Sequence, residues 1–465
     1  MNAQRLFVGS CLAIAATALA FSVRADIIPA LKADFGLTDT EIGQIAGSGL
    51  WGFAITIVLG GMLLDSLGMG RLMTFAFVGH VGGVVMTLLA QGFWQLFFAT
   101  LLMGLAQGTI EAVTNPLAVT LYPQERTKRL NILHAWWPVG LIVGGLLAYG
   151  LTLLMNLNGT DAAAEVTSLG WKIKMGVVLL PILFYGGLFF NQSFPKTERL
   201  TSGVSYAQMF TVMRRPLFLF LLFLMLLTTA TELGPDNWVG NLLQNLVGIQ
   251  GVLILVYTAG LMFVLRQFFS GVLVKALGPV GLLTLSAIVA ALGLFWLSFA
   301  KGAVVVLVAA TLFGIGKTFF WPCMLGITSE RFPEGGAFAL GLMGGAGIIS
   351  AGFLMVPAMG VLQDKYALQK ISELSPPTLQ KVLKDGTRGI DEKKVRALSD
   401  AREREVVQEA KTYSAVMTYR WIALVPTVLA VVFAGLLFYF RSIGGYRAVE
   451  IEKPQQPAGA HLNSA

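Results

Sequence analysis

Twelve apolar segments, most of them about twenty residues long, follow one another along this chain of 465 residues. A helix rises about 1.5 Å per residue, so about twenty apolar residues cross the hydrocarbon of a bilayer. Hydrophobic residues make up 55% of the chain and charged residues only 12%, roughly half the charge of an ordinary soluble domain. The pattern predicts an all-α integral membrane protein, with spans near residues 5–28, 41–64, 72–91, 94–121, 131–155, 171–194, 217–242, 249–274, 280–299, 303–329, 337–362 and 419–440.

The longest polar connection between two groups of six spans covers residues 195–216. We therefore expect an N-terminal half at 1–194, a linker at 195–216, and a C-terminal half at 217–465 that carries a helical insertion at 363–418. Within the insertion, Ser375 and the prolines after it are typical of a helix start, and Asp391 can cap a longer helix. The insertion is therefore predicted to form a small two-helix cap.

The distribution of lysine and arginine among the loops predicts the orientation of the chain. With the N-terminus in the cytoplasm, most basic loop residues lie inside, including Arg71, Arg126 and the linker arginines. The short external loops then carry few basic residues. Both termini and the linker are thus predicted to be cytoplasmic and the insertion external, in a multi-pass protein of the cell membrane.

A repeated pattern links the two halves. Span 2 ends in Gly61-x-x-x-Asp65-x-x-Gly68-x-x-Arg71, and span 8 ends with the same spacing in Gly271-x-x-x-Lys275-x-x-Gly278. The same offset pairs Asp26 with Asp236 and Gly104 with Gly314. A parallel duplication of six spans is one of the architectures of secondary transporters, in which the solute binds between the halves.

The stretch Gly61–Arg71 resembles the loop 2–3 signature of the major facilitator superfamily, and the span number and duplication extend the likeness over nearly the whole chain. A closer resemblance is to the fucose–proton symporter branch. The matching residues are Asp26-Ile27-Ile28-Pro29 in span 1, Glu111-x-x-x-Asn115-Pro116 in span 4, and Arg129-Leu130-Asn131 followed by His134 in span 5. Arg24 and the pair Trp136-Trp137 depart from that pattern.

Ionisable residues inside spans are costly, by about 2.5–3.5 kcal/mol each at the centre of a span, and therefore indicate function or pairing. Three cations face four carboxylates, so one carboxylate is left without a fixed partner, and desolvation makes such a group able to hold a proton. Proton relays in transporters are built from such groups. The residues are Arg24, Asp26, Glu111, Glu232, Asp236, Arg266 and Lys317.

The resemblance implies that Asp26 couples transport to protons, that Glu111 accepts hydrogen bonds from a sugar hydroxyl, and that both line one central cavity. Purely structural alternatives remain open. Arg266 and Lys317 can pair with Glu232 or Asp236, and Asp26 can pair with Arg24 or lie in an external vestibule. His134, a lone histidine on an apolar helix, can be a satisfied core donor.

Aromatic and polar side chains near these charges predict the solute site, because a sugar ring offers an apolar face and hydroxyl groups. Pro138, Pro235 and Pro322 are expected to break the spans near the same depth, where transporter sites collect. Gly61, Asp65, Gly68 and Arg71 are assigned to a cytoplasmic gating motif. The predicted solute-binding residues are Glu111, Asn115, Asn131, His134, Trp137, Asn237, Trp238, Lys317 and Trp321.

The sequence lacks the phosphate loop of an ATP-driven pump, and its three histidines fit neither a zinc-protease nor a di-haem site. We expect no enzyme activity, cofactor, metal or nucleic-acid partner, and a monomer that binds a small solute and protons. The preferred function is symport of a small polar solute, most simply a sugar, with protons by alternating access. Organic-anion uptake through Arg24, Arg266 and Lys317, metabolite or drug efflux, and a membrane sensor are the alternatives.

Overall fold

The computed structural model describes residues 2–35, 37, 39–155, 168–247, 251–300, 302–383, 389–390, 394–395 and 397–451. Within these ranges the side chains of residues 29, 32–33, 39–40, 168, 236–247, 251–255 and 356–357 lie outside the description. Every regular element in the described ranges is a helix, apart from one isolated bridge between Leu383 and Ile390.

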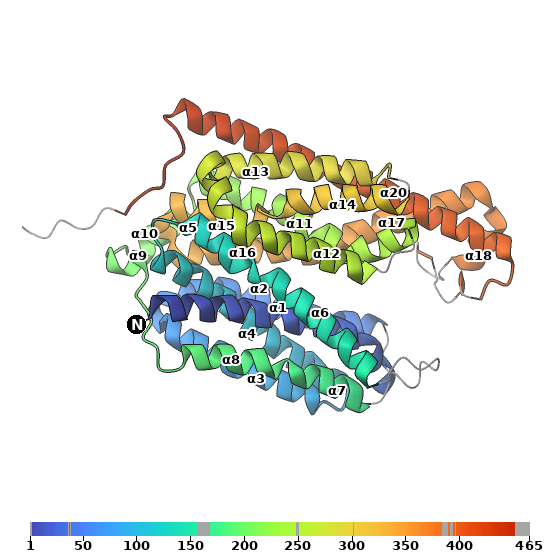
Figure 1. Cartoon of the computed structure of the whole chain (residues 1–465), viewed down its shortest axis with the longest axis horizontal. Coiled ribbons are helices and arrows are strands. Elements are labelled where there is room, and N and C mark those ends of the chain that lie inside the picture. The colour runs from blue at the N-terminus through green and yellow to red at the C-terminus, as the bar shows by residue number, and fades with distance from the viewer. Residues whose placement is uncertain are drawn as a thin grey trace, which may run out of the picture.

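The helices form two bundles that lie side by side along their length (Figure 1). The first bundle, residues 3–189, carries the N-terminus at the end where the chain passes between the bundles. We call this the linker end, after the short helices of residues 198–212. Its helices are α1 (Ala3–Asp34), α2 (Asp39–Leu67), α3 (Met69–Leu88), α4 (Phe93–Leu121), α5 (Arg126–His134), α6 (Trp136–Leu154), α7 (Ser168–Val177) and α8 (Leu179–Phe189).

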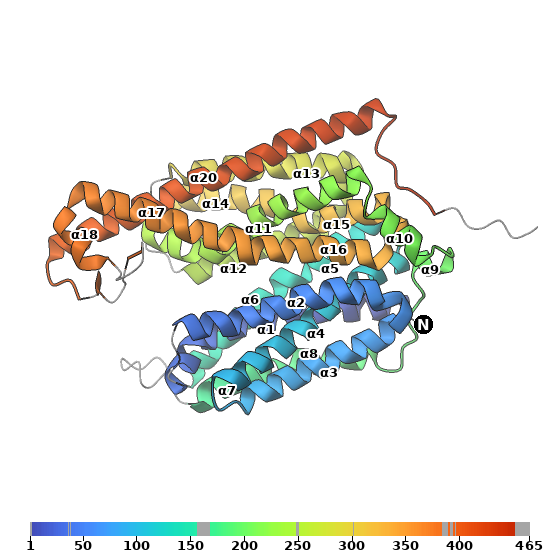
Figure 2. The same cartoon turned by 180° about the vertical axis from the view of Figure 1, so that it is seen from behind.

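The second bundle begins after the linker and extends beyond the first at the opposite end (Figure 2). We call this opposite end the cap end. The linker helices are α9 (Glu198–Thr201) and α10 (Tyr206–Val212). The second bundle contains α11 (Pro216–Val247), α12 (Gly251–Val264), the π-helix η2 (Leu265–Phe269), α13 (Ser270–Leu297), α14 (Ala303–Lys317), α15 (Phe320–Arg331), η3 (Pro333–Gly335), α16 (Gly336–Ile349), η4 (Ser350–Met355), α17 (Val356–Leu374), α18 (Pro376–Val382) and α20 (Ala401–Ser442).

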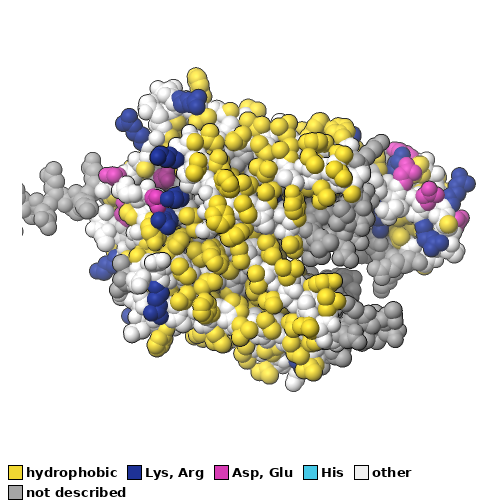
Figure 3. Space-filling model, viewed as in Figure 1, with side chains coloured by type: hydrophobic (Ala, Val, Ile, Leu, Met, Phe, Trp, Pro, Cys, Tyr) yellow, Lys and Arg dark blue, Asp and Glu magenta, His cyan; other side chains and the backbone are white. Residues whose placement is uncertain are grey.

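Eleven helical stretches in the described residues are long and apolar enough to cross a membrane. One of them, Val256–Leu297, has 42 residues and would be about 63 Å long if straight, twice the thickness of the hydrocarbon. The chain turns within it at Gly278, where φ is 68°, so this stretch supplies two spans. The twelve-span prediction is confirmed. On the face seen in Figure 3, apolar side chains cover the middle of the molecule and charged side chains gather at its two ends, so we call the middle the apolar belt.

The glycines of the repeated pattern occupy corresponding places in the two halves. Gly68 and Gly278 both have positive φ, 84° and 68°, and each allows the turn between two spans where a residue with a Cβ would be strained. Gly61 of α2 faces α16 of the other half, and Gly271 of α13 faces Lys128 of α5, also in the other half. The offset seen in the sequence thus corresponds to two helical hairpins that each contact the opposite bundle.

The insertion at 363–418 extends two long helices beyond the apolar belt. Ser375 caps α18 by accepting a hydrogen bond from the backbone N–H of Thr378, as the sequence predicted. The long helix α20 begins at Ala401, with Asp400 as its N-cap, whereas the predicted cap Asp391 lies outside the described residues. A small separate core holds the cap together, made of Ile371, Val382, Leu398, Val407 and Ala410.

Two of the three expected helix breaks are present. Span 5 is divided between α5 and α6 at Ala135, and span 10 is divided between α14 and α15 at Thr318 and Phe319. The prediction was wrong for Pro235, which lies inside the continuous helix α11. A single proline removes one backbone hydrogen bond, and neighbouring helices can hold such a span together.

Candidate functional site

A chain of three polar side chains lies buried in the first half. Asn115 donates its Nδ2–H to Glu111 Oε2 over 2.8 Å, and its Oδ1 lies 2.9 Å from Nε2 of His134. Because the amide nitrogen of Asn115 is already donating, its oxygen is the acceptor and His134 carries its proton on Nε2. Among the described side chains, His134 is the one basic group within ion-pair distance of Glu111, at 3.8 Å.

A second buried group faces this chain from the other half and is centred on Arg266. Its Nη2 donates to Glu232 Oε1 over 2.7 Å, and both side chains are almost completely buried. The second oxygen of Glu232 accepts the backbone N–H of Trp321 over 3.1 Å. Arg266 also donates to two backbone carbonyls, that of Thr318 over 2.6 Å and that of His134 over 3.1 Å. Its guanidinium therefore joins the two halves.

The two groups line one cavity of about 50 Å³. This is room for a few water molecules and too little for a sugar or an aromatic acid, so a solute requires the halves to move apart. The aromatic walls belong to both halves, and the rings of Trp321 and His134 meet in a T-shaped contact with 6.2 Å between their centroids. The lining residues are Phe53, Glu111, His134, Trp137, Glu232, Leu233, Arg266, Trp321 and Ile348.

Of the remaining predicted binding residues, Lys317 and Asn131 are buried but do not line this cavity, and the others are outside the description. Lys317 is buried, with its Nζ 5.6 Å from the centre of the Phe313 ring. Asn131 donates to the carbonyl of Thr127 and approaches the Sγ of Cys323 in the other half at 3.6 Å. The side chains of Asp236, Asn237 and Trp238 are outside the described part of the chain.

Asp26 and Arg24 are not brought to this cavity. Asp26 is about one third exposed and pairs with Lys174 of α7 over 2.7 Å. Arg24, two residues earlier, points to a different side of α1, because two residues rotate a helix by about 200°. It lines a separate apolar cavity of about 100 Å³ that Thr100 of α4 also lines. Thr100 lies eleven residues from Glu111, which corresponds to about 16 Å along α4.

Two sequence expectations are therefore not met in this conformation. Asp26 does not share a cavity with Glu111, and it does not pair with Arg24. The count of buried charges had left out Lys174, which the sequence placed in a short loop. Among the described residues, Arg24 has no carboxylate within ion-pair distance, and its Nε is buried without a hydrogen-bond partner.

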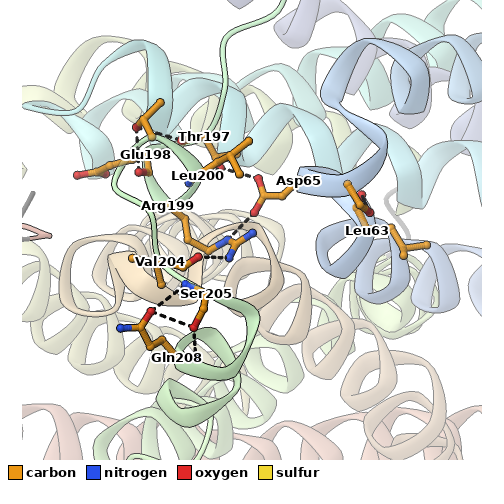
Figure 4. A network of polar contacts seen from close by, with 11 residues as sticks. Leu63, Asp65, Thr197, Glu198, Arg199, Leu200, Val204, Ser205 and Gln208 are labelled. Carbon is orange, nitrogen blue, oxygen red and sulfur yellow. Dashed lines mark hydrogen bonds and ion pairs between the residues drawn. The ribbon is translucent and has the colours of Figure 1, made fainter. Parts of the chain in front are cut away.

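The linker folds onto the gating motif (Figure 4). Arg199 donates from Nε to Asp65 Oδ2 and Thr197 donates to Asp65 Oδ1, both over 2.5 Å, and the Asp65 and Arg199 side chains are almost fully buried. Arg199 also donates to the carbonyl of Val204 over 2.6 Å. The motif residue Arg71 is exposed on α3. The carboxylate of the motif is thus paired by the linker, not by the arginine within the motif.

Further contacts close the two halves against each other at the linker end. Arg126 of α5 donates to the carbonyl of Ser329 in α15 and pairs with Glu198 of the linker, both over 2.7 Å. Thr127 donates its hydroxyl to Glu330 Oε1 over 2.5 Å. The other oxygen of Glu330 accepts the hydroxyl of Tyr446, in the segment after α20, over 2.7 Å.

Sequence reasoning missed most of the linker-end residues. Arg126 and Arg199 were used only as markers of orientation, and Glu198 and Glu330 were not singled out. The available signal was the excess of charge at 123–129, 196–199 and 330–334, which all lie at one end of the spans. Phe53 and Ile348 of the cavity carry no distinguishing signal, because apolar residues fill every span.

Three comparisons place this architecture among known proteins. The model of the Major Facilitator Superfamily matches residues 6–366. The cis,cis-muconate transport protein of Acinetobacter baylyi is 24% identical over 345 residues, covering 68% of this chain and 78% of that protein. A sodium-dependent phosphate transport protein of Arabidopsis thaliana is 26% identical over 147 residues, 31% of this chain and 28% of that protein.

Among solved structures, the transporter FucP in its outward conformation is similar with a TM-score of 0.67 and 14% identity. The match covers 92% of this chain and 98% of FucP. At this identity the likeness concerns the fold alone. Together with the family match over most of the chain, it shows that this protein is a membrane transporter of the major facilitator superfamily.

Proposed function

We propose that the protein carries a small organic acid across the cell membrane together with protons. The proposal rests on two residues that line the same buried cavity. One is an arginine with N–H groups that no described residue accepts, and the other is a carboxylate without a lysine or arginine partner among the described residues. The arginine is Arg266 and the carboxylate is Glu111.

Arg266 has the donors that a carboxylate needs. A guanidinium carries five N–H groups, and Arg266 uses three of them in bonds to described residues, one each on Nε, Nη1 and Nη2. Among the described residues, the second N–H of each terminal nitrogen has no acceptor, and Arg266 lines the cavity. Two N–H groups on neighbouring nitrogens fit the two oxygens of a carboxylate, which is the geometry for which arginine is used in proteins.

Glu111 supplies the proton site. An ionised carboxylate is expensive to bury without a cation, and a bound anion would place a second negative charge in the same cavity. A proton on Glu111 removes that repulsion, so anion and proton enter together and leave together. Asn115 holds the carboxyl group in place in either state through its hydrogen bond, and His134 in turn holds Asn115.

The curated relatives support an acid as the solute. One is named as a muconate transport protein and another as a phosphate transport protein, and both names describe anions. The aromatic walls of Trp137, Trp321 and Phe53 suit the apolar body of an organic acid better than the sphere of an inorganic anion.

The basic loop residues support an orientation for the proposed cycle. Most of them lie at the linker end, which supports a cytoplasmic linker end with both termini inside and the cap outside. The contacts of Asp65, Arg126 and Glu330 then form the cytoplasmic gate. The solute reaches the cavity when the halves part at the cap end, and leaves when these contacts open.

A sugar is the second candidate, and one observation favours it. Glu111 lines one cavity together with Trp137 and Trp321, and Asn115 is hydrogen-bonded to Glu111. A carboxylate that shares a cavity with aromatic rings suits the hydroxyl groups and the apolar face of a sugar ring.

Uptake into proteoliposomes separates the two. The panel contains mono- and dicarboxylates and neutral hexoses, each with and without an inward proton gradient. We expect gradient-driven uptake of at least one acid and none of the hexoses, and loss of that uptake in Arg266→Gln. Gradient-driven uptake of a hexose, with no acid transported or competing, would replace the acid by the sugar. Uptake that ignores the gradient would remove proton coupling.

A further inference from the structure

The two broken spans leave two backbone carbonyls without their usual partner. A carbonyl in a helix accepts the N–H of the residue four positions later, and proline has no N–H. Pro138 therefore frees the carbonyl of His134, and Pro322 frees the carbonyl of Thr318. These spans belong to opposite halves, and each helix ends next to the freed carbonyl, α5 at His134 and α14 at Lys317.

Both freed carbonyls accept a hydrogen bond from the same side chain. Arg266 donates Nε to the Thr318 oxygen over 2.6 Å and Nη1 to the His134 oxygen over 3.1 Å. Arg266 itself lies in the π-helix η2, which widens the helix locally. Two prolines far apart in the sequence thus provide the acceptors for one buried guanidinium.

We infer that Pro138 and Pro322 are positioning residues for the anion-binding arginine. This inference rests on the proposed function for its consequence in transport. Because the single N–H of Nε is held by the Thr318 carbonyl, Arg266 cannot form the Nε–Nη2 fork with Glu232, whose second oxygen accepts the N–H of Trp321. The ion pair is made by one bond, from Nη2, and Arg266 is a lining residue of the cavity.

The hydrogen bond from Arg266 to the His134 carbonyl also makes the position of the guanidinium depend on the contact between the two halves. Of the bonds that Arg266 makes to described residues, it is the one that crosses between the halves, since Thr318 and Glu232 belong to its own half. The orientation of the guanidinium is therefore complete only when the first half presents its broken helix. A solute that binds Arg266 thus senses whether the two halves are together at this depth.

The test replaces each proline by alanine, which restores the N–H and lets the helix recapture its carbonyl. Pro426 in α20 is the matched control, because no side chain among the described residues donates to the carbonyl it frees, that of Ile422. We expect Pro138→Ala and Pro322→Ala to raise the KM for the transported acid about tenfold, the usual size of a lost charge-assisted hydrogen bond, with a smaller change in maximal rate. Pro426→Ala should stay within about twofold.

A second substitution distinguishes the missing N–H from the rigid ring. The α-hydroxy analogue of alanine, lactic acid, introduced at position 138 makes an ester that has no N–H and no ring. If the freed carbonyl is what matters, this chain behaves like the parent, whereas Pro138→Ala does not. If the ester chain is as impaired as Pro138→Ala, the ring sets the helix geometry and the inference is wrong.

A measurement without solute keeps the inference independent of the proposed substrate. Melting temperatures of the purified full chain are compared for Pro138→Ala, Arg266→Lys and the double variant. Arg266→Lys keeps the positive charge but loses the planar guanidinium that bonds to both carbonyls. We therefore expect Pro138→Ala to lower the melting temperature much less in the Arg266→Lys background. Additive shifts would overturn the inference whatever the solute. If the shifts are not additive but the protein transports only hexoses, the acid is wrong as the proposed solute and the positioning role of the prolines still holds.

Discussion

Gly61 of α2 lies so close to the backbone of α16 that a Cβ atom at this position would be 2.6 Å from the carbonyl oxygen of Ala337. The two residues belong to different halves, and they meet at the linker end. A backbone oxygen cannot move aside as a flexible side chain can, so this contact requires glycine.

Gly61→Ala should therefore loosen the closed linker end, at a cost of about 1–3 kcal/mol to the closed state, the usual penalty of overpacking. A cysteine at Ser329, which is buried there, should react faster with an impermeant maleimide than in the parent. Gly43→Ala on the same helix is the control, since nothing lies within 4 Å of its added Cβ. Equal labelling in all three chains would contradict a closing role for Gly61.

The buried pair Asp65–Arg199 should matter more than the exposed pair Arg215–Glu334 at the same end. Removing one partner of a buried ion pair costs about 3–5 kcal/mol, whereas exposed pairs are worth at most about 1 kcal/mol. We expect Asp65→Asn to lower the transport rate at least tenfold and Arg215→Gln to leave it within about twofold. Similar losses in both variants would show that burial of the pair is not what stabilises the gate.

The segment after α20 should detach at high pH. Burial, with the nearby Glu330 adding to it, raises the pKa of Tyr446 well above its usual value, so the docked segment holds the phenolic proton more tightly than the released one. Docking is then at full strength below the ordinary tyrosine pKa of about 10 and weakens as the pH rises above it.

Limited proteolysis of residues 443–451 at pH 8 and pH 10.5 measures this release. We expect faster cleavage at the higher pH in the parent. Tyr446→Phe should be cleaved faster than the parent at pH 8, because about 1 kcal/mol of hydrogen bonding to Glu330 is lost, and it should show little further change with pH. A parent whose cleavage does not respond to pH would contradict the docking role of this tyrosine.

Substitutions of Glu111 and Asp26 are expected to have opposite effects on proton coupling. Glu111→Gln should abolish accumulation of solute against a gradient while exchange of solute continues, because the cavity then holds a fixed neutral group. Asp26→Asn should keep accumulation, since the partly exposed pair with Lys174 contributes about 1 kcal/mol and lies outside the cavity. Counterflow and gradient-driven uptake in the same vesicles distinguish the two. Loss of accumulation in Asp26→Asn alone would return the coupling role to Asp26.

The proposed orientation is tested by single cysteines at Thr211 in α10 and Ser399 in the cap, both exposed. In right-side-out vesicles an impermeant thiol reagent should label Ser399→Cys at once and Thr211→Cys only after permeabilisation. The two native cysteines are buried and give a low background. Labelling of both positions from one side would contradict the assignment of the two ends.

The spans and the repeat could be predicted because they depend on local pattern. Apolar runs have a length that the bilayer sets, and glycines at a constant offset mark turns with positive φ, as at Gly68 and Gly278. The grouping of Glu111, Asn115 and His134 was also accessible, since an ionisable group in a span needs a polar neighbour one helical turn away or on the next helix.

The partners across long sequence distances could not be predicted. Asp65 binds Arg199 and Asp26 binds Lys174, 134 and 148 residues away, and periodicity within a helix does not report how a linker returns. The role of Arg266 was hidden for another reason. Its acceptors are backbone oxygens, which every residue has, and only the two prolines distinguish them.

The helix α20 runs unbroken for 42 residues, from the cap to the linker end. Such a rod is about 63 Å long, while the hydrocarbon it crosses is about 30 Å thick. It therefore acts as a lever fixed to the second half. A rotation of about 15°, the size of known subunit rotations, would sweep its far end through roughly 16 Å if it pivots at the linker end. A fluorophore or an antibody fragment bound to the cap could thus report or restrain the movement of the second half from the aqueous side, without entering the path of the solute.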